Sequence, residues 1–171
     1  MKLLLASTAS GLKDKLNHIP DLNLSEKNVL CITTAALVEE DWEDWLPVEI
    51  EHVKSRARTF AEYDITGKSK QDLDRAFKNY DMIFVTGGNT FYLMQQMRSS
   101  GFKDAICKKL EEGGTYFGTS AGAVVACPDI NYMKDMDDAS QGDVENTKGL
   151  NLVDFLILPH AGKNHPHFAE A

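Results

Sequence analysis

The chain has 171 residues, of which 43% are hydrophobic and 26% charged, which is typical of one soluble globular domain with a sizeable core. Its net charge of −8 argues against the phosphate backbone of nucleic acids or an anionic membrane as a partner, and no apolar run is long enough to span a bilayer. The three cysteines at 31, 107 and 127 form neither a zinc spacing nor an even disulfide set, so a reducing cytoplasm is the expected compartment.

Short apolar runs alternate with helical patterns along the first three quarters of the chain. Strands are expected near residues 3–6, 28–33, 61–65, 81–86 and 115–117, and helices near 12–16, 39–60, 69–77, 91–97 and 102–112. The first run is too short for the apolar part of a signal peptide, and Pro47 must lie in the first turn of its helix or break it. This alternation predicts a single α/β domain, a three-layer sandwich around a mostly parallel sheet.

The chain changes character after Pro128. Residues 129–146 are polar and acidic and are expected to form loops or a small hairpin. A last apolar run follows at residues 150–158, and we interpret it as a strand that ends at Pro159 and His160.

A Gly-x-Ser-x-Gly motif, Gly118 to Gly122, lies between the expected strand at 115–117 and an apolar helical segment. In a nucleophile elbow, small residues let strand and helix backbones pack together while the serine projects from the turn. A plain Gly/Ser/Ala turn has the same residues, so the motif alone leaves both readings open.

Three candidate groups follow strand ends: Gly87-Gly88-Asn89, Ser120 and His160. Ligands of open α/β sheets collect at the carboxyl ends of the strands. There a histidine can accept a serine proton, a carboxylate can orient the histidine, and the N–H groups of a Gly-Gly turn can bind an oxyanion.

Each group also has a plainer reading. Gly87 and Gly88 can form a simple turn with Asn89 or Thr90 capping a helix, a lone histidine is often a surface residue, and the acidic run at 135–138 is often a solvated loop. A metal site built from the histidines at 160, 165 and 167 is disfavoured, because acidic or cysteine ligands at metal-site spacing are missing. We therefore expect no metal and no cofactor.

Taken together, five segments resemble the peptidase E family in order and spacing over nearly the whole chain. These are Gly87-Gly88-Asn89-Thr90-Phe91, Gly118-Thr119-Ser120-Ala121-Gly122-Ala123, Cys127-Pro128, Asp135-Met136 and Leu158-Pro159-His160. The family comprises serine peptidases, including aspartyl dipeptidases, on a fold similar to class I glutamine amidotransferases and flavodoxin. The resemblance implies Ser120 as nucleophile, His160 as general base and Asp135 as the acidic member.

The same resemblance implies oxyanion donors in Gly88 and Ala121, with Gly87 and Asn89 beside them. Asp137 and Asp138 remain alternatives to Asp135. His167, in a Pro-His-Phe segment, remains an alternative to His160.

The chain departs from the family at its end. We expect one catalytic domain over residues 1–171, without the family's C-terminal part. The arginine that binds the substrate aspartate in true aspartyl dipeptidases has no match here, so aspartate specificity is not supported.

We therefore expect a serine-type peptidase that hydrolyses small peptides through an acyl-enzyme on Ser120, with a homo-oligomer left open. Alternatives are a cyanophycinase-like peptidase and a non-catalytic or truncated relative that acts as a binding domain. A lipase of the α/β-hydrolase type fits less well, because such chains are longer and lack the Gly-Gly-Asn-Thr-Phe turn.

Overall fold

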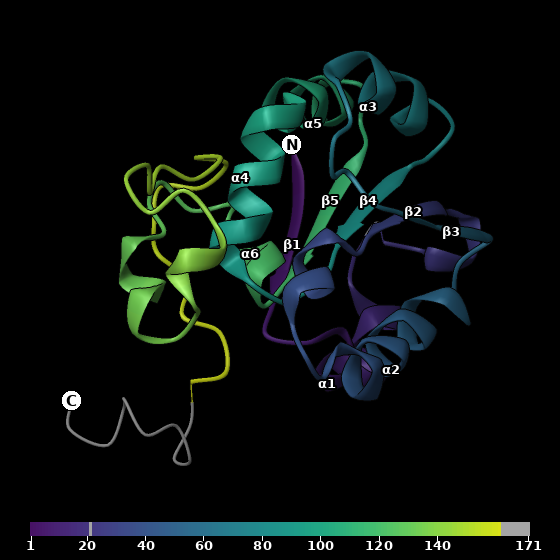
Figure 1. Cartoon of the computed structure of the whole chain (residues 1–171). Coiled ribbons are helices and arrows are strands. Elements are labelled where there is room, and N and C mark those ends of the chain that lie inside the picture. Colours follow the sequence, from purple (N-terminus) through teal and green to yellow (C-terminus); the bar gives the residue numbers. More distant parts are fainter. Residues whose placement is uncertain (21, 162–171) are drawn as a thin grey trace.

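The computed structural model of the chain describes residues 1–20 and 22–161, and its centre is a five-stranded sheet (Figure 1). The strands are β1 (Lys2–Ala6), β2 (Asn28–Ile32), β3 (Thr59–Tyr63), β4 (Met82–Val85) and β5 (Thr115–Thr119). They lie in the order β1-β5-β4-β2-β3, and every neighbouring pair is parallel. All five carboxyl ends therefore meet at one edge of the sheet.

Helices cover both faces of the sheet, as expected for a three-layer sandwich. The helices are α1 (Ala9–Leu12), α2 (Trp42–Lys54), α3 (Lys70–Phe77), α4 (Thr90–Ser100), α5 (Phe102–Glu111) and α6 (Ala121–Val124). In β4, Met82 and Phe84 point to the α1–α2 side, and Ile83 and Val85 point to the side of α3 to α6. Because strand side chains alternate between faces, a run buried along its whole length serves two cores.

Three of the expected boundaries are wrong. Instead of one helix near 12–16, the chain forms the short α1, which ends at Leu12, and then a 3₁₀ helix, η1 (Lys13–His18). The third strand is two residues earlier than expected, at Thr59–Tyr63. The helix expected over 39–60 is shortened to Trp42–Lys54, and it continues through Pro47, which lies beyond its first turn. Pro47 is exposed and removes one backbone hydrogen bond, the one to the carbonyl of Glu43, which the helix tolerates.

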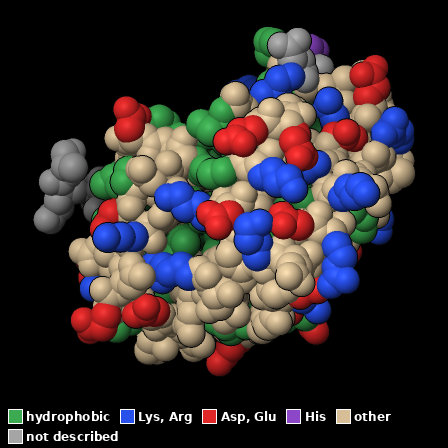
Figure 2. All heavy atoms as spheres, turned by 90° about the horizontal axis from the view of Figure 1, so that it is seen from above, with side chains coloured by type: hydrophobic (Ala, Val, Ile, Leu, Met, Phe, Trp, Pro, Cys, Tyr) green, Lys and Arg blue, Asp and Glu red, His purple; other side chains and the backbone are tan. Residues whose placement is uncertain are grey.

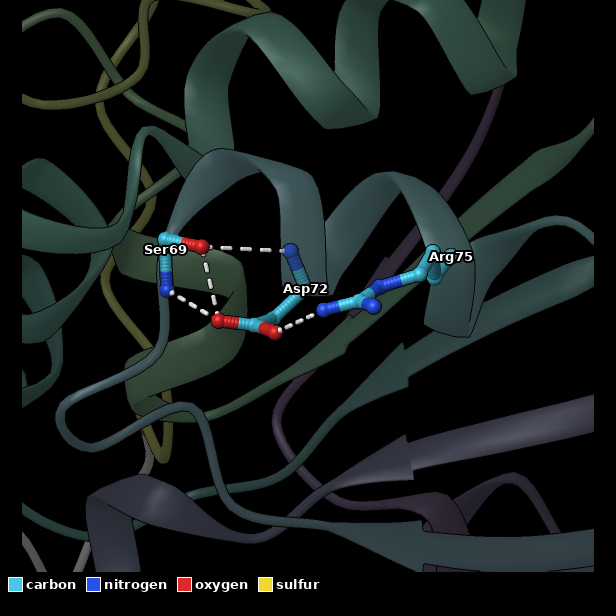
Figure 3. A network of polar contacts seen from close by, with 3 residues as sticks. All are labelled: Ser69, Asp72 and Arg75. Carbon is cyan, nitrogen blue, oxygen red and sulfur yellow. Dashed lines mark hydrogen bonds and ion pairs between the residues drawn. The ribbon is translucent and has the colours of Figure 1, made fainter.

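The start of α3 follows its sequence signal closely. The Ser69 hydroxyl accepts a hydrogen bond from the Asp72 N–H, and the Asp72 carboxylate accepts one from the Ser69 N–H (Figure 3). Arg75 forms an ion pair with the same carboxylate at 2.6 Å. This reciprocal capping box fixes the helix start predicted at Ser69.

The segment after α6 contains little regular structure. It holds two short 3₁₀ helices, η4 (Asn131–Asp135) and η5 (Ala139–Gln141), and one antiparallel bridge between Asp129 and Lys148. The strand expected at 150–158 does not form: the segment pairs with none of the strands in residues 1–20 and 22–161, and it leaves Phe155 and Leu156 exposed. His160 therefore follows a loop.

The surface charges and the helix lengths complete the description of residues 1–20 and 22–161. Lys, Arg, Asp and Glu side chains are interspersed over the end of the molecule seen from above, where α3 and α5 lie (Figures 1 and 2). Within residues 1–20 and 22–161, no helix has the length and apolar character needed to cross a bilayer.

Candidate active site

Ser120 occupies the sharp turn between β5 and α6, with a backbone φ of 49° and ψ of −118°. Positive φ at a residue other than glycine costs about 1–3 kcal/mol, so the surrounding fold must hold the turn. The backbones are in close contact here: a Cβ on Gly122 would lie 2.2 Å from the carbonyl oxygen of Val85. The Ser120 N–H donates to the carbonyl of Ala6 at 3.0 Å. The local geometry is that of a nucleophile elbow.

The ring of His160 lies against this serine. Its Nε2 is 2.9 Å from the Ser120 Oγ. The His160 backbone has a φ of 59°, and its N–H donates to the Ser7 hydroxyl at 3.1 Å. With the ring proton on Nδ1, Nε2 can accept a hydrogen bond from the serine hydroxyl, which is the arrangement that a general base needs.

The Gly87-Gly88 turn lies beside the serine, at the carboxyl end of β4. Gly88 has a φ of 123°, and a Cβ on it would lie 2.2 Å from the carbonyl carbon and oxygen of Ala35. No described residue accepts a hydrogen bond from the N–H of Gly88 or of Ala121. Gly88 lines a cavity beside Ser120, whereas Ala121, the residue after Ser120, is buried, and an unpaired N–H is what an oxyanion hole requires.

Asn89 has a different place from its neighbours. Its side-chain oxygen accepts hydrogen bonds from the N–H groups of Phe91 and Tyr92 at 3.1 and 3.0 Å, which caps α4. Its Nδ2 donates to the carbonyl of Asp138 at 3.0 Å. Asn89 is buried, and its hydrogen bonds connect the Gly87-Gly88 turn to the acidic loop. It does not belong to the described cavity lining.

The three candidate carboxylates of the acidic loop lie in different surroundings. Asp135 is exposed at the end of η4, and Asp138 is exposed and accepts hydrogen bonds from the N–H and hydroxyl of Ser140. Asp137 is half-buried and accepts a hydrogen bond from the Thr90 N–H at 2.9 Å. Burial raises the pKa of Asp137, while Thr90 and the nearby His160 oppose that rise. Asp137 is therefore the best candidate of the three to act on His160, since it is half-buried and its pKa responds to the charge of His160.

A second acid, Glu39, lies near Asp137. Burial raises the pKa of Glu39, and the charge of Asp137 raises it further. Sequence reasoning did not single out Glu39, because nothing in the local pattern marks it as lying opposite the loop at 137.

A cavity of about 450 Å³ opens beside Ser120. It is lined by Ser7, Thr8, Ser10, Asp44, Trp45, Val48, Glu49, Gly87, Gly88, Thr119, Ser120 and His160. A larger surface hollow of about 890 Å³ lies at the amino ends of the strands and contains none of these groups. The cavity at the carboxyl ends is the candidate active site, since Ser120 and His160, the candidate nucleophile and base, line it together.

Several lining residues escaped the sequence analysis. Ser7 directly follows β1, so the rule that sites collect at carboxyl ends could have found it. Trp45 is half-buried and lies on the cavity wall, although a tryptophan in a helix more often packs in a core. Asp44 and Glu49 had no motif to mark them.

Metal binding has no visible basis in the described part of the chain, where no three His, Cys, Asp or Glu side chains gather as ligands. His165 and His167, and with them the alternative base, lie outside the described residues.

Comparison with known sequences gives consistent matches. The model of peptidase family S51 matches residues 3–171. An uncharacterized peptidase of Listeria monocytogenes is 37% identical over 139 residues, which cover 81% of this chain and 67% of the relative. An uncharacterized peptidase of Pasteurella multocida is 31% identical over 164 residues, covering 93% and 76%. A peptidase E of Nostoc sp. is 41% identical over 83 residues, covering 48% and 33%.

Comparison with solved structures agrees. The crystal structure of a candidate peptidase E protein from Listeria monocytogenes EGD-e aligns with a TM-score of 0.83 and 34% identity, covering 94% of this chain and 80% of that one. A peptidase from an acI-B1 Actinobacterium aligns with a TM-score of 0.60 at 19% identity, covering 92% and 67%, and supports the fold alone. The resemblance and the α/β fold expected from the motifs are confirmed, and the chain spans about two thirds of its Listeria monocytogenes sequence relative.

Proposed function

Because this chain belongs to peptidase family S51, we propose that it hydrolyses small peptides through an acyl-enzyme formed on Ser120. Family membership and the peptidase E relatives support a serine peptidase. The acyl-enzyme, the peptide substrate and the residue roles below are our proposal.

In the first half of the reaction, the Ser120 Oγ attacks the scissile carbonyl carbon while His160 Nε2 takes the hydroxyl proton. The 2.9 Å separation of these two atoms supports this step. The N–H groups of Gly88 and Ala121 bind the oxyanion that develops. When the C–N bond breaks, the imidazolium returns the proton to the leaving amine, and the acyl group stays on the serine.

In the second half, water attacks the ester and His160 accepts its proton. The carboxylic acid leaves, and the proton returns to Ser120. Asp137 stabilises the imidazolium through its negative charge in both halves, which its electrostatic interaction with His160 supports.

The observation that carries the proposal is the contact between a strained elbow serine and a histidine 40 residues away. A non-catalytic binding domain has no need of this contact or of free N–H donors beside it. A cyanophycinase-like activity differs in substrate, so a branched aspartyl-arginine polymer belongs in the substrate panel.

The test is hydrolysis of a dipeptide library by the full chain, its Ser120→Ala variant and a control variant. Ser99→Ala is the control, since Ser99 is an exposed serine of α4 outside the cavity. We expect Ser120→Ala to lower kcat by at least 10³-fold and Ser99→Ala to leave it unchanged. Turnover that survives in Ser120→Ala rules out the acyl-enzyme.

A further inference from the structure

The charges that line the cavity beside Ser120 are of one sign. Apart from His160, its ionisable residues are Asp44 and Glu49, both from α2. No Lys or Arg belongs to the described lining. The ion pairs of the described residues lie elsewhere, on α3, on α5 and between Arg58 and Asp81, so they leave these carboxylates uncompensated.

The two carboxylates differ in what they can do. Glu49 is 8% exposed and accepts hydrogen bonds from the N–H groups of Ala9 and Ser10 and from the Ser10 hydroxyl. It holds the start of α1 and adds negative charge to the wall. Asp44 is exposed, and no hydrogen bond or ion pair joins its carboxylate to a described residue. It is therefore available to bind a ligand.

The adjoining wall suits an organic cation. Trp45 and Val48 lie on the same stretch of α2 and give the cavity an aromatic and an aliphatic surface. An ammonium or guanidinium group gains from a carboxylate and an indole face together. A volume of about 450 Å³ suits a small ligand such as the end of a short peptide. A carboxylate side chain would instead be repelled by two like charges.

We propose that this cavity binds a positively charged group on the acyl side of the scissile bond, with Asp44 as its ion-pair partner and Trp45 as its aromatic wall. The cation is either the α-ammonium group of the peptide or a Lys or Arg side chain. The position of this cation site relative to the scissile bond rests on the proposed function. In this inference, Asp44 selects the substrate.

The kinetic test compares dipeptides whose first residue is lysine, norleucine or aspartate, each with a free and an acetylated α-amine. Norleucine matches the length of lysine without its charge. For either source we expect kcat/KM to be lowest for the aspartate peptide, and a side-chain source also places the lysine peptide above the norleucine peptide. If the side chain is the source, acetylation leaves the lysine preference in place. If the α-ammonium group is the source, acetylation lowers kcat/KM for the norleucine peptide.

Two variants of one residue test the assignment to Asp44. Asp44→Asn should reduce the effect of the cation about fivefold, the upper end for an exposed ion pair, and Asp44→Lys should place the aspartate peptide above the lysine peptide. Glu43→Gln is the matched control, because Glu43 is an exposed neighbour on α2 outside the lining. Equal rates for charged and uncharged peptides, or an effect equally large in Glu43→Gln, would overturn the inference.

A binding measurement separates this inference from the proposed function. In Ser120→Ala, lysinamide should change the tryptophan fluorescence at a lower concentration than acetylated norleucinamide, and Asp44→Asn should remove that difference. If the cation binds in this way but no peptide is hydrolysed, the proposed function fails and the cation site stands. If peptides are hydrolysed through Ser120 without any preference for cations, the cation site fails alone.

Discussion

Asp135 and Asp137 stand two positions apart, yet they differ in surroundings: Asp135 is exposed, whereas Asp137 is half-buried and the charge of His160 lowers its pKa against the effect of burial. We predict that Asp137→Asn lowers kcat about 10²- to 10⁴-fold, as loss of the charge that stabilises an imidazolium does elsewhere, whereas Asp135→Asn changes it little. Steady-state kinetics of both variants checks this. A larger loss in Asp135→Asn would restore the assignment made from the Asp-Met motif.

The same substitution, Asp137→Asn, should lower kcat but not the thermal stability of the chain. Burial raises the pKa of Asp137 in the folded state, so its contribution is full below the unfolded pKa and is lost as pH rises through the folded pKa. At a pH above the folded pKa the charged carboxylate therefore no longer stabilises the folded state, and an asparagine oxygen can still accept a hydrogen bond from the Thr90 N–H. We predict that Asp137→Asn has a Tm at pH 7 equal to or above that of the parent chain, measured by calorimetry. A clear fall in Tm would contradict this.

A substitution at Gly88 tests how closely the Gly87-Gly88 turn approaches Ala35. A methyl group there meets the Ala35 carbonyl at 2.2 Å and sits on a backbone with a φ of 123°. We predict that Gly88→Ala costs about 3 kcal/mol or more of unfolding free energy and also lowers kcat. Gly67→Ala is the control, since its φ is also positive but nothing lies within 4 Å of the added carbon. Equal losses in urea titrations of the two variants would refute the close approach.

Among the elements, α3 should give the chain part of its acid sensitivity. The hydrogen bonds to the hydroxyl and N–H of Ser69, and then Arg75, lower the pKa of Asp72 to about 2 (Figure 3). A depressed pKa contributes stability above the unfolded value of 3.8, and that contribution is lost as pH falls toward 2. We predict that Asp72→Asn flattens the fall in Tm between about pH 4 and 2. Glu43→Gln is the control, since it also removes one exposed acid. If Tm falls with pH in the same way in Asp72→Asn and in Glu43→Gln, the prediction is wrong.

The element that sequence reasoning missed is the segment at 150–158. Its apolar run is typical of a strand, but strand formation depends on a free partner edge, which composition does not reveal. Here the Tyr132 hydroxyl donates to the Ile157 carbonyl at 2.6 Å, and the Ile157 N–H donates to the Cys127 sulfur. Long-range contacts of this kind hold His160 in place through a loop, and no local pattern encodes them.

At the scale of the whole molecule, every strand of the sheet contributes to one or both cores, so the described fold should unfold as one unit. Phe84 is fully buried and stacks on Phe117 with ring centroids 4.7 Å apart. We predict that Phe84→Ala costs about 3–5 kcal/mol and keeps the midpoints from circular dichroism and tryptophan fluorescence coincident. Leu37→Ala, at an exposed side chain, is the control. Separate midpoints would show that the two faces unfold independently.

The layer architecture could be predicted from the strand patterns, and the places of Gly88 and Ser120 from the ends of β4 and β5. His160 was expected at the end of a strand, but it follows a loop. Gly88, Ser120 and His160 each follow an apolar run, and the structure brings them to one edge of the sheet. The cavity wall on α2 could not be predicted, since which face of a helix turns toward the site depends on packing. The choice between Asp135 and Asp137 likewise depends on burial. Two positions apart in a loop, one side chain can be exposed and the other half-buried.

The central claim is that Ser120 is a nucleophile activated by His160, and covalent labelling tests it most directly. The full chain is treated with a fluorophosphonate, and the modified residue is located by peptide mass spectrometry. We predict one adduct per chain, on Ser120, and a labelling rate at least 10²-fold lower in His160→Ala. A correctly folded chain that stays unlabelled at Ser120, or that labels as fast without His160, would contradict the account.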